Sequence, residues 1–306
     1  MTLEQLRIFV AVATREHVTQ AARDLNLTQS ATSAAVAALE ARYQTKLFDR
    51  VGRRIVLTAT GKAFLVEARS ILARVAAAET VLDDLAGLQR GQLALAASQT
   101  IANDWLPAFI HRFNVAHPAI TLSLAIGNTE QVAGLVREGG ADLGFVEGRV
   151  DDPLLALQAV ADDELVLVGP IGHALCDGKP VTAGALKRAR WVLREQGSGT
   201  RAMFEQALEG LGLRLADLDI AFDLPSNEAV RSAVEAGAGV TVISRLVVAR
   251  ALKASTLAIA AIAFPPRQFY SLRHREHHQT QAAREFLRMV GEAGAAASGS
   301  PSLRGA

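Results

Sequence analysis

From Gly91 onward the chain alternates short apolar runs with stretches of helical spacing, and this alternation restricts the fold more than any other feature. The apolar runs are Gln92–Ala97, Thr121–Gly127, Asp142–Val146, Glu164–Gly169, Trp191–Leu193, Ile220–Leu224, Val240–Ile243 and Leu257–Ala261. The helical stretches are Ala102–His117, Gln131–Glu138, Thr200–Leu211, Asn227–Ala236 and Arg245–Leu252. Such alternation predicts an α/β domain, and we expect its strands to be mostly parallel.

The order of these segments also predicts two lobes within this domain, which spans 91–292. Residues 269–272 and the helix after them are expected to return to the first lobe. The first lobe then covers 92–162 and 266–292, and the second covers 163–265. The tail over 293–306 is rich in Ala, Gly and Ser and is predicted to be disordered.

Residues 1–58 predict a separate helical unit that ends in a hairpin. Thr2 and Gln5 form a capping-box pattern, a short helix follows over about 17–25, and Thr28 is a suitable N-cap for a third helix. Two helices joined by a tight turn are typical of a helix-turn-helix, whose second helix enters the major groove of DNA with its N-terminal residues. Because small polar side chains and Gln pair with base edges, we assign DNA contacts to Thr28, Gln29, Ser30, Thr32 and Ser33.

The hairpin after this helix carries three arginines, Arg50, Arg53 and Arg54, which we expect to contact phosphates. Residues 1–62 hold nine Lys and Arg against five acidic residues, whereas the remaining residues carry a small negative charge. A basic unit joined to a mildly acidic body is consistent with DNA binding by the first unit. The alternative is a three-helix bundle whose polar face is merely solvated.

Residues 59–90 read as one long linker helix. Its apolar residues recur at intervals of four and three, as in a coiled coil: Phe64, Ala68, Ile71, Val75, Ala78, Leu82 and Leu85. Such a seam directly after a helix-turn-helix predicts a dimer, because paired DNA half-sites need paired recognition helices. The alternative is a long surface helix that packs on its own domain.

Small polar residues follow several of the predicted strands, where ligands bind in open α/β sheets. These corners are Ser98-Gln99-Thr100, Asn128-Thr129, Gly197-Ser198-Gly199-Thr200-Arg201 and Ser226-Asn227. Hydroxyls and free N–H groups at helix N-termini bind anions, and Arg201 adds a charge. We therefore predict a small anionic ligand, although the same residues are also the usual helix caps.

Other classes of protein find little support in the residues. HExxH, CxxC and GxxxxGK[ST] motifs are absent, and the cluster His274, His277 and His278 lies in a charged connector, so we expect no metal, no cofactor and no enzyme. A start without signal character, the lack of a long apolar run and a single cysteine favour a cytoplasmic protein without a membrane span. A solute-binding component and an α/β enzyme remain the alternatives.

The first 62 residues resemble the winged helix-turn-helix of LysR-type transcriptional regulators almost end to end. The matching positions are Phe9, Ala21-Ala22, Leu25, Thr28-Gln29-Ser30-Ala31, Ser33, Leu39-Glu40, Leu47-Phe48-Asp49-Arg50, Arg53, Leu57-Thr58 and Gly61. One departure is Ala34, where many members carry Arg or Lys. Base readout is therefore expected to depend more on Gln29, the hairpin and DNA shape.

The remainder resembles the effector domain of the same family, which has a periplasmic-binding-protein-like fold. The strings ASQTIANxxLP, GNTEQV, ADLGFVEG, REQGSGTR and SNEAVRSAVEAGAGVTVIS look most like the regulators of sulfur and CO2-fixation operons. The resemblance implies that Ser98, Thr100, Thr129 and Thr200 line an interlobe cleft, to which we add Ser198, Arg201 and Asn227. It also implies operator DNA, a small effector, a second copy through the linker helix, a tetramer and RNA polymerase as partners.

Overall fold

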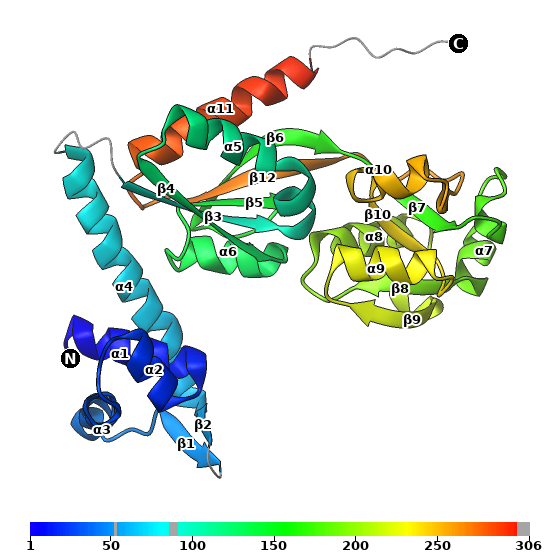
Figure 1. Ribbon diagram of the computed structural model, residues 1–306. Helices are drawn as coiled ribbons and strands as arrows, with labels where there is room; N and C mark the ends of the chain where they lie inside the picture. Colours follow the sequence, from blue (N-terminus) through cyan, green and yellow to red (C-terminus); the bar gives the residue numbers. More distant parts are fainter. Residues whose placement is uncertain (52–53, 86–90, 299–306) are drawn as a thin grey trace. The chain divides into compact units, whose positions relative to one another are not determined.

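The computed structural model describes residues 1–51, 54–85 and 91–298, which divide into two compact units. The first unit is built on residues 1–87, and the second on residues 88–137 and 141–306. Figure 1 shows the first unit in blue to cyan and the second in green to red.

The first unit is a helical core with a two-stranded hairpin. Its elements are α1 (Leu3–Arg15), α2 (Val18–Asp24), α3 (Gln29–Tyr43), β1 (Phe48–Val51), β2 (Arg54–Leu57) and α4 (Ala59–Leu85). The predicted capping box is present, since Thr2 Oγ1 accepts from Gln5 N and the Gln5 side chain accepts from Thr2 N. Asn26 ends the turn after α2 with a φ of 55°, a conformation that Asn tolerates better than most residues.

The core of this unit lies between α1, α3, the hairpin and the start of α4. Phe9 is fully buried and contacts the rings of Phe48 and Phe64. Gly61 lies so close to the hairpin that an added Cβ would be 2.1 Å from the Leu47 carbonyl oxygen. The start of α4 therefore packs on the hairpin, and only glycine fits at position 61.

The linker helix differs from the predicted seam at its first turns. Phe64 and Ala68, placed on the seam, instead pack in the unit's own core with Leu6 and Leu39. The first turns of α4 lie against α1, so the side of α4 that carries Phe64 and Ala68 faces α1 there. Farther along, Ile71 and Leu82 are exposed, so the part of the stripe that lacks an intradomain partner begins at Ile71.

The first lobe of the second unit is a five-stranded sheet covered on both faces. Its elements are β3 (Gly91–Ser98), a π-helical turn η1 (Ile101–Trp105), α5 (Pro107–Ala116), β4 (Ile120–Gly127), α6 (Thr129–Arg137), β5 (Leu143–Glu147), β6 (Leu155–Asp163), β12 (Arg267–His274) and α11 (Gln281–Ser298). The strand order is β4-β3-β5-β12-β6. The helices α5 and α11 cover one face, and α6 covers the other.

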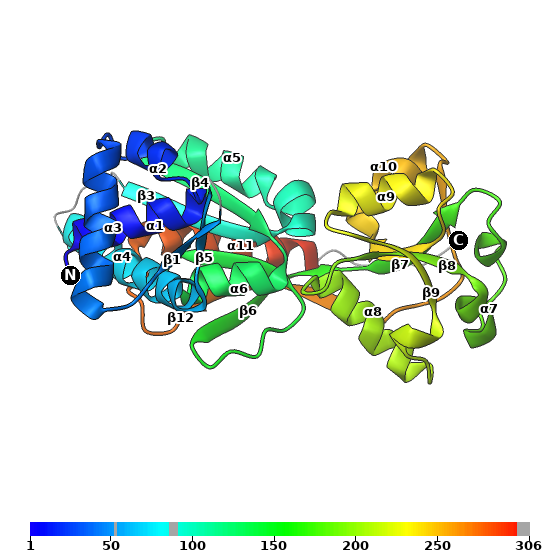
Figure 2. The ribbon, with the colours of Figure 1, turned by 90° about the horizontal axis from the view of Figure 1, so that it is seen from below.

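The second lobe holds a three-stranded and a two-stranded sheet. Its elements are β7 (Leu165–Pro170), η2 (Ala174–Cys176), α7 (Ala183–Arg188), β8 (Arg190–Arg194), α8 (Gly199–Gly210), η3 (Leu215–Asp217), β9 (Asp219–Leu224), α9 (Asn227–Glu235), β10 (Thr241–Ser244), α10 (Arg245–Lys253) and β11 (Leu257–Ile259). The helices α9 and α10 pack on one side and α8 on the other, as Figure 2 also shows.

Strand direction departs from the expectation of mostly parallel pairs. The pairs β3–β4, β3–β5 and β8–β9 are parallel, whereas β12 is antiparallel to β5 and β6, and β7 is antiparallel to β10 and β11. In the first lobe the cause is that the chain passes twice between the lobes: β6 leads out of the first lobe and β12 returns in the opposite direction. The sequence pattern does not predict β6 as a strand, and it predicts β12 only as the short segment 269–272.

Two further segments differ from their predictions. The helix expected over Ala102–His117 begins instead as the turn η1 and continues as α5 from Pro107, whose missing N–H suits the first position of a helix. The last helix runs to Ser298, so residues 293–298 are helical rather than disordered, because Ala favours helix and outweighs the glycines. Residues 299–306 lie outside the described residues.

Candidate functional site

The N-terminus of α3 presents a small polar surface. Thr28 caps the helix, since its Oγ1 accepts from Ala31 N at 3.2 Å, and it also forms a hydrogen bond with Ser30 Oγ at 3.0 Å. Gln29, Ser30 and Ser33 are exposed. The exposed side chains are small or flexible, so the backbone of α3 can approach a groove closely.

Thr32 does not belong to this surface, in contrast to the sequence-based assignment. Its side chain is fully buried and its hydroxyl donates to the Thr28 carbonyl at 3.0 Å. The helical period turns position 32 toward α1 and α2, on the same side as buried Leu39. Thr32 therefore supports the first turn of α3 from inside.

The hairpin β1–β2 is held to α3 by one carboxylate. Glu40 Oε1 accepts from the N–H groups of Leu47 at 2.8 Å and Phe48 at 3.2 Å, and Oε2 pairs with Lys46 Nζ at 2.9 Å. Partial burial raises the pKa of Glu40, but the hydrogen bonds from Lys46 and the two backbone N–H groups outweigh it and hold the pKa below its usual value. Glu40 thus fixes the hairpin relative to the helix.

Two of the three predicted arginines, Arg50 and Arg54, lie on the strands of this hairpin. Arg50 pairs with Ile55, and Arg54 pairs with Val51, in antiparallel register. Arg53 lies outside the described residues, as do the side chains of Arg50 and Arg54. Their contact with phosphates stays a prediction.

A second polar cluster lies in the other unit, where strands of both lobes end. Ser98, Thr100, Thr200 and Asn227 are all buried there. Asn227 Nδ2 donates to Thr100 Oγ1 at 3.0 Å, and Asn227 Oδ1 accepts from Arg194 Nη1 at 2.5 Å. The hydroxyl of Ser98 is buried without a hydrogen-bond partner in the described part of the chain. Ser198 is buried as well, so five of the seven predicted effector residues are buried polar groups.

Arg267 and Asp163, at the ends of the two strands that connect the lobes, extend the cluster. Arg267 Nη1 donates to Thr200 Oγ1 at 3.1 Å, and its Nε donates to Asp163 Oδ2 at 2.6 Å. Ser244 Oγ donates to the other Asp163 oxygen at 2.7 Å. A buried ion pair therefore stands directly behind Thr200.

A second ion pair, Arg194 with Glu195, lies behind Asn227. Arg194 Nε donates to Glu195 Oε2 at 2.7 Å, and Asn128 Nδ2 donates to Glu195 Oε1 at 3.3 Å. Burial raises the pKa of Glu195, but hydrogen bonds from Arg194 and its positive charge lower the pKa by more. Neither Arg194 nor Arg267 is among the site residues expected from the sequence. A sequence signal for Arg194 as a site residue is its position directly after the apolar run Trp191–Leu193.

Helix capping explains only part of this chemistry. Ser226 Oγ caps α9 by accepting from Ala229 N at 3.0 Å. Thr100 and Ser198, however, stand at the N-cap positions of η1 and α8 without any capping hydrogen bond from their side chains. The first N–H groups of α8 therefore receive no acceptor from the residue that usually supplies one.

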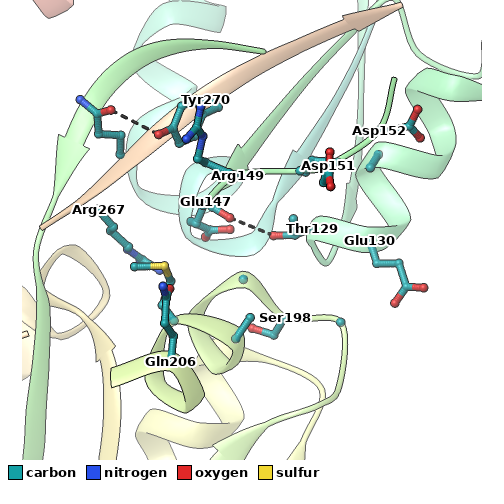
Figure 3. A pocket seen from close by; sticks show the side chains of 18 of the residues that line it. Thr129, Glu130, Glu147, Arg149, Asp151, Asp152, Ser198, Gln206, Arg267 and Tyr270 are labelled. Carbon is teal, nitrogen blue, oxygen red and sulfur yellow. Dashed lines mark hydrogen bonds between the residues drawn. The ribbon is translucent and has the colours of Figure 1, made fainter. Parts of the chain in front are cut away.

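Thr129 and Ser198 also line a cavity of about 1140 Å³ beside this cluster (Figure 3). Thr129 Oγ1 donates to the Glu147 carbonyl at 3.5 Å, and a Cβ added at Gly199 would lie 2.6 Å from both of these oxygens. The N-terminus of α8 thus lies directly against the end of β5. The cavity continues between Arg149, Gln206 and Tyr270.

Arg201 is not brought into the cluster. Its guanidinium pairs with Glu205 at 2.8 Å and Asp223 at 2.7 Å, and it also donates to the Arg194 carbonyl at 2.9 Å. These three acceptors engage the guanidinium, and no hydrogen bond joins it to Ser98 or Thr100 within the described residues.

Hydrogen bonds also join the two lobes. Gln99 donates to the Pro225 carbonyl at 2.8 Å and accepts from Asn227 N at 2.9 Å. Asn103 donates to Glu228 at 3.0 Å. These bonds from Gln99 and η1 to Pro225 and the start of α9 join the two lobes next to the cluster.

The described residues contain no group of His, Cys, Asp and Glu that can hold a metal ion. In the same part of the chain, no helix is long and apolar enough to cross a membrane.

These features define a helix-turn-helix unit joined to a two-lobed ligand-binding unit. Residues 3–62 match the model of the bacterial regulatory helix-turn-helix proteins of the lysR family, and residues 86–295 match the LysR substrate binding domain. The chain therefore belongs to the LysR family of transcriptional regulators, as its residues predicted. It is a DNA-binding regulator with an effector-binding domain, and its family is one of regulators rather than enzymes.

Relatives and solved structures cover most of the chain. The uncharacterized HTH-type transcriptional regulator YeiE of Escherichia coli K12 is 35% identical over 289 residues, which is 94% of this chain and 96% of that protein. A RuBisCO operon transcriptional regulator of Allochromatium vinosum is 31% identical, with 95% of each chain covered. The predicted similarity to regulators of CO2-fixation operons is thereby confirmed.

The crystal structure of full-length CbnR with its target DNA shares the fold, with a TM-score of 0.68, 23% identity and coverage of 96% of this chain and 100% of that one. The regulatory domain of Synechocystis CcmR, in complex with 2-PG, is 26% identical with a TM-score of 0.62 and covers 67% of this chain and 98% of that domain.

Proposed function

We propose that this regulator reads a specific operator through the exposed start of α3 and responds to a small metabolite with an anionic group. The metabolite binds between the lobes, at Ser98, Thr100, Thr129, Ser198, Thr200 and Asn227. Arg201 is left out of this set because its guanidinium is already engaged by two carboxylates.

The observation that carries the ligand proposal is a set of buried donors without acceptors. Ser98 Oγ has no partner in the described part of the chain, and Ser198 leaves the start of α8 uncapped. Unmet donors in a buried site are costly, and an anion supplies acceptors to several of them at once. The CcmR domain, which was solved with the small molecule 2-PG, supports a ligand in this fold.

The reading of DNA is supported by the geometry of α3. Gln29, Ser30 and Ser33 are exposed on the first turns of the helix, where a helix-turn-helix contacts base edges. Glu40 holds the hairpin to α3, and we expect Arg50 and Arg54 on its strands to reach the adjacent phosphates.

Ser98→Ala tests the ligand proposal because the lost hydroxyl has no partner within the protein. We expect the melting temperature of the ligand-free variant to be equal to or slightly above that of the wild type, because the change removes an unpartnered buried hydroxyl. The rise in melting temperature on adding a binding anion should shrink, corresponding to a loss of about 0.5–1.5 kcal/mol of binding free energy. The screen uses sulfate, phosphate and small carboxylates.

Ser226→Ala is the matched control, because that hydroxyl caps α9. It should lower the melting temperature with and without ligand by a similar amount. The proposal fails if no anion raises the melting temperature of the wild type, or if Ser98→Ala leaves the anion's effect unchanged.

A further inference from the structure

Glu147 is a buried carboxylate that the proposed anion site does not explain. It ends β5, has an exposed fraction of only 4%, and lines the cavity beside the cluster. Its backbone carbonyl accepts from Thr129, whereas its carboxylate, which lines the cavity, has no hydrogen bond or ion pair within the described ranges. Figure 3 shows this side chain among those of Thr129, Ser198 and Arg267.

The other buried charges at the lobe junction are paired. Arg267 pairs with Asp163, and Arg194 pairs with Glu195. Neither guanidinium is within ion-pair distance of the Glu147 carboxylate. Glu147 is thus the charged group at this junction that has no partner among the described residues, and a cationic group in the cavity can pair with it.

The wall of the cavity carries more negative than positive residues. Its acidic members are Glu130, Glu147, Asp151, Asp152 and Asp162, and its basic members are Arg137, Arg149 and Arg267. Arg137 is paired with Asp152 and Arg267 with Asp163, so the cavity attracts a positive group more than a second negative one.

At this corner of the cavity, the start of α8 and the end of β5 lie side by side and attract groups of opposite charge. The uncapped start of α8 favours an anionic group, and the position of Gly199 puts that start in direct contact with the end of β5 that carries Glu147. A ligand that fills the corner therefore meets donors on one side and a carboxylate on the other.

We propose that the effector is a zwitterion, an amino acid or a related compound with a primary ammonium group. Its ammonium pairs with the Glu147 carboxylate, and its acidic group occupies the donors at Ser98, Ser198 and the start of α8. This inference rests on the proposed function and adds the second group of the ligand. A simple oxyanion would instead place a second negative charge near Glu147.

The test uses three amino acids, each matched with the hydroxy acid of the same skeleton: L-alanine with L-lactate, L-aspartate with L-malate, and L-phosphoserine with 3-phosphoglycerate. Binding to the full chain is measured by thermal shift and calorimetry. We expect at least one amino compound to bind about 10- to 100-fold more tightly than its hydroxy partner, the gain typical of hydrogen bonds to a charged group. Glu147→Gln keeps the shape and should bring that ratio close to one.

Asp151→Asn is the control, since this carboxylate lies at the exposed rim of the same cavity and should leave the ratio nearly unchanged. If Glu147→Gln does not fold, the ratio of amino-acid to hydroxy-acid affinity on the wild-type protein still tests the inference. Equal or tighter binding of the hydroxy acids overturns the inference, as does an amino preference that survives Glu147→Gln. If sulfate, phosphate or the hydroxy acids bind and no amino acid does, the inference is wrong and the anion proposal stands. If nothing binds, both fail.

Discussion

At the scale of single residues, the DNA-binding unit depends on carboxylate contacts as well as on its apolar core. Glu40 satisfies two backbone N–H groups at the base of the hairpin and pairs with Lys46. Because the ionised form makes these bonds, the folded unit holds the pKa of Glu40 below the value that it has in an unfolded chain. The connection between α3 and the hairpin is therefore coupled to pH.

The pH dependence has a definite sign. A lowered pKa in the folded state stabilises the unit above the unfolded pKa of about 4.3, and this stabilisation is lost as pH falls through the folded value. We expect the protection of the Leu47 and Phe48 amides against hydrogen exchange, corrected for intrinsic rates, to drop on acidification across that range. In Glu40→Gln the protection should already be reduced at pH 7 and should change little with pH. A wild-type protection that is flat down to pH 3 would refute the role given to Glu40.

At the scale of elements, α3 separates a reading face from a packing face. Gln29, Ser30 and Ser33 are exposed, while Thr32 and Leu39 are buried. Each successive position on a helix is rotated by about a hundred degrees, so the exposed and the buried residues lie on different faces of α3.

Gln29→Ala is expected to lower the discrimination between operator and random DNA by about 1–3 kcal/mol, because Gln can pair bidentately with a base. Affinity for random DNA should stay the same, since that binding comes from phosphate contacts. Fluorescence anisotropy at fixed salt measures both affinities. A specificity ratio that does not change would show that α3 reads DNA through other side chains.

The contrast between α3 and the ligand cluster shows how much the sequence can predict. Spacing within one helix predicted the cap Thr28 and the exposed Gln29, because neighbours on a helix are three or four positions apart. Arg267 bonds to Asp163 and Thr200, which are more than sixty positions away, and no local pattern reports such partners. Glu147 was missed for a related reason: it ends an apolar run, and its burial depends on residues from both lobes. The antiparallel passage of β6 and β12 likewise depends on the whole topology.

At the scale of the whole molecule, α4 offers the surface through which two copies can meet. Its stripe is buried in the unit's own core at Phe64 and Ala68, whereas Ile71 is 37% exposed and Leu82 is 68% exposed. Large apolar residues left exposed at heptad spacing are typical of a coiled-coil interface. Dimerisation through α4 remains our prediction.

The double change Ile71→Asp and Leu82→Asp is expected to shift the protein to a smaller species in sedimentation velocity and to weaken operator binding. Carboxylates in an apolar interface are costly when unpaired. Glu67→Gln and Glu79→Gln on the same helix serve as the control pair and should leave the size unchanged. Circular dichroism checks that both units stay folded. An unchanged sedimentation coefficient in the aspartate variant would mean that copies associate through another surface.

The hydrogen bonds between the two lobes bear on how fast a ligand is released. Gln99 and Asn103 tie the first lobe to Pro225, Asn227 and Glu228 next to the buried cluster. If the proposed ligand leaves only after these bonds break, its release is slower than from an open groove of equal affinity. A regulator with slow release averages its signal: a brief dip in the metabolite's concentration passes before the bound fraction changes, and the transcriptional output follows the sustained level.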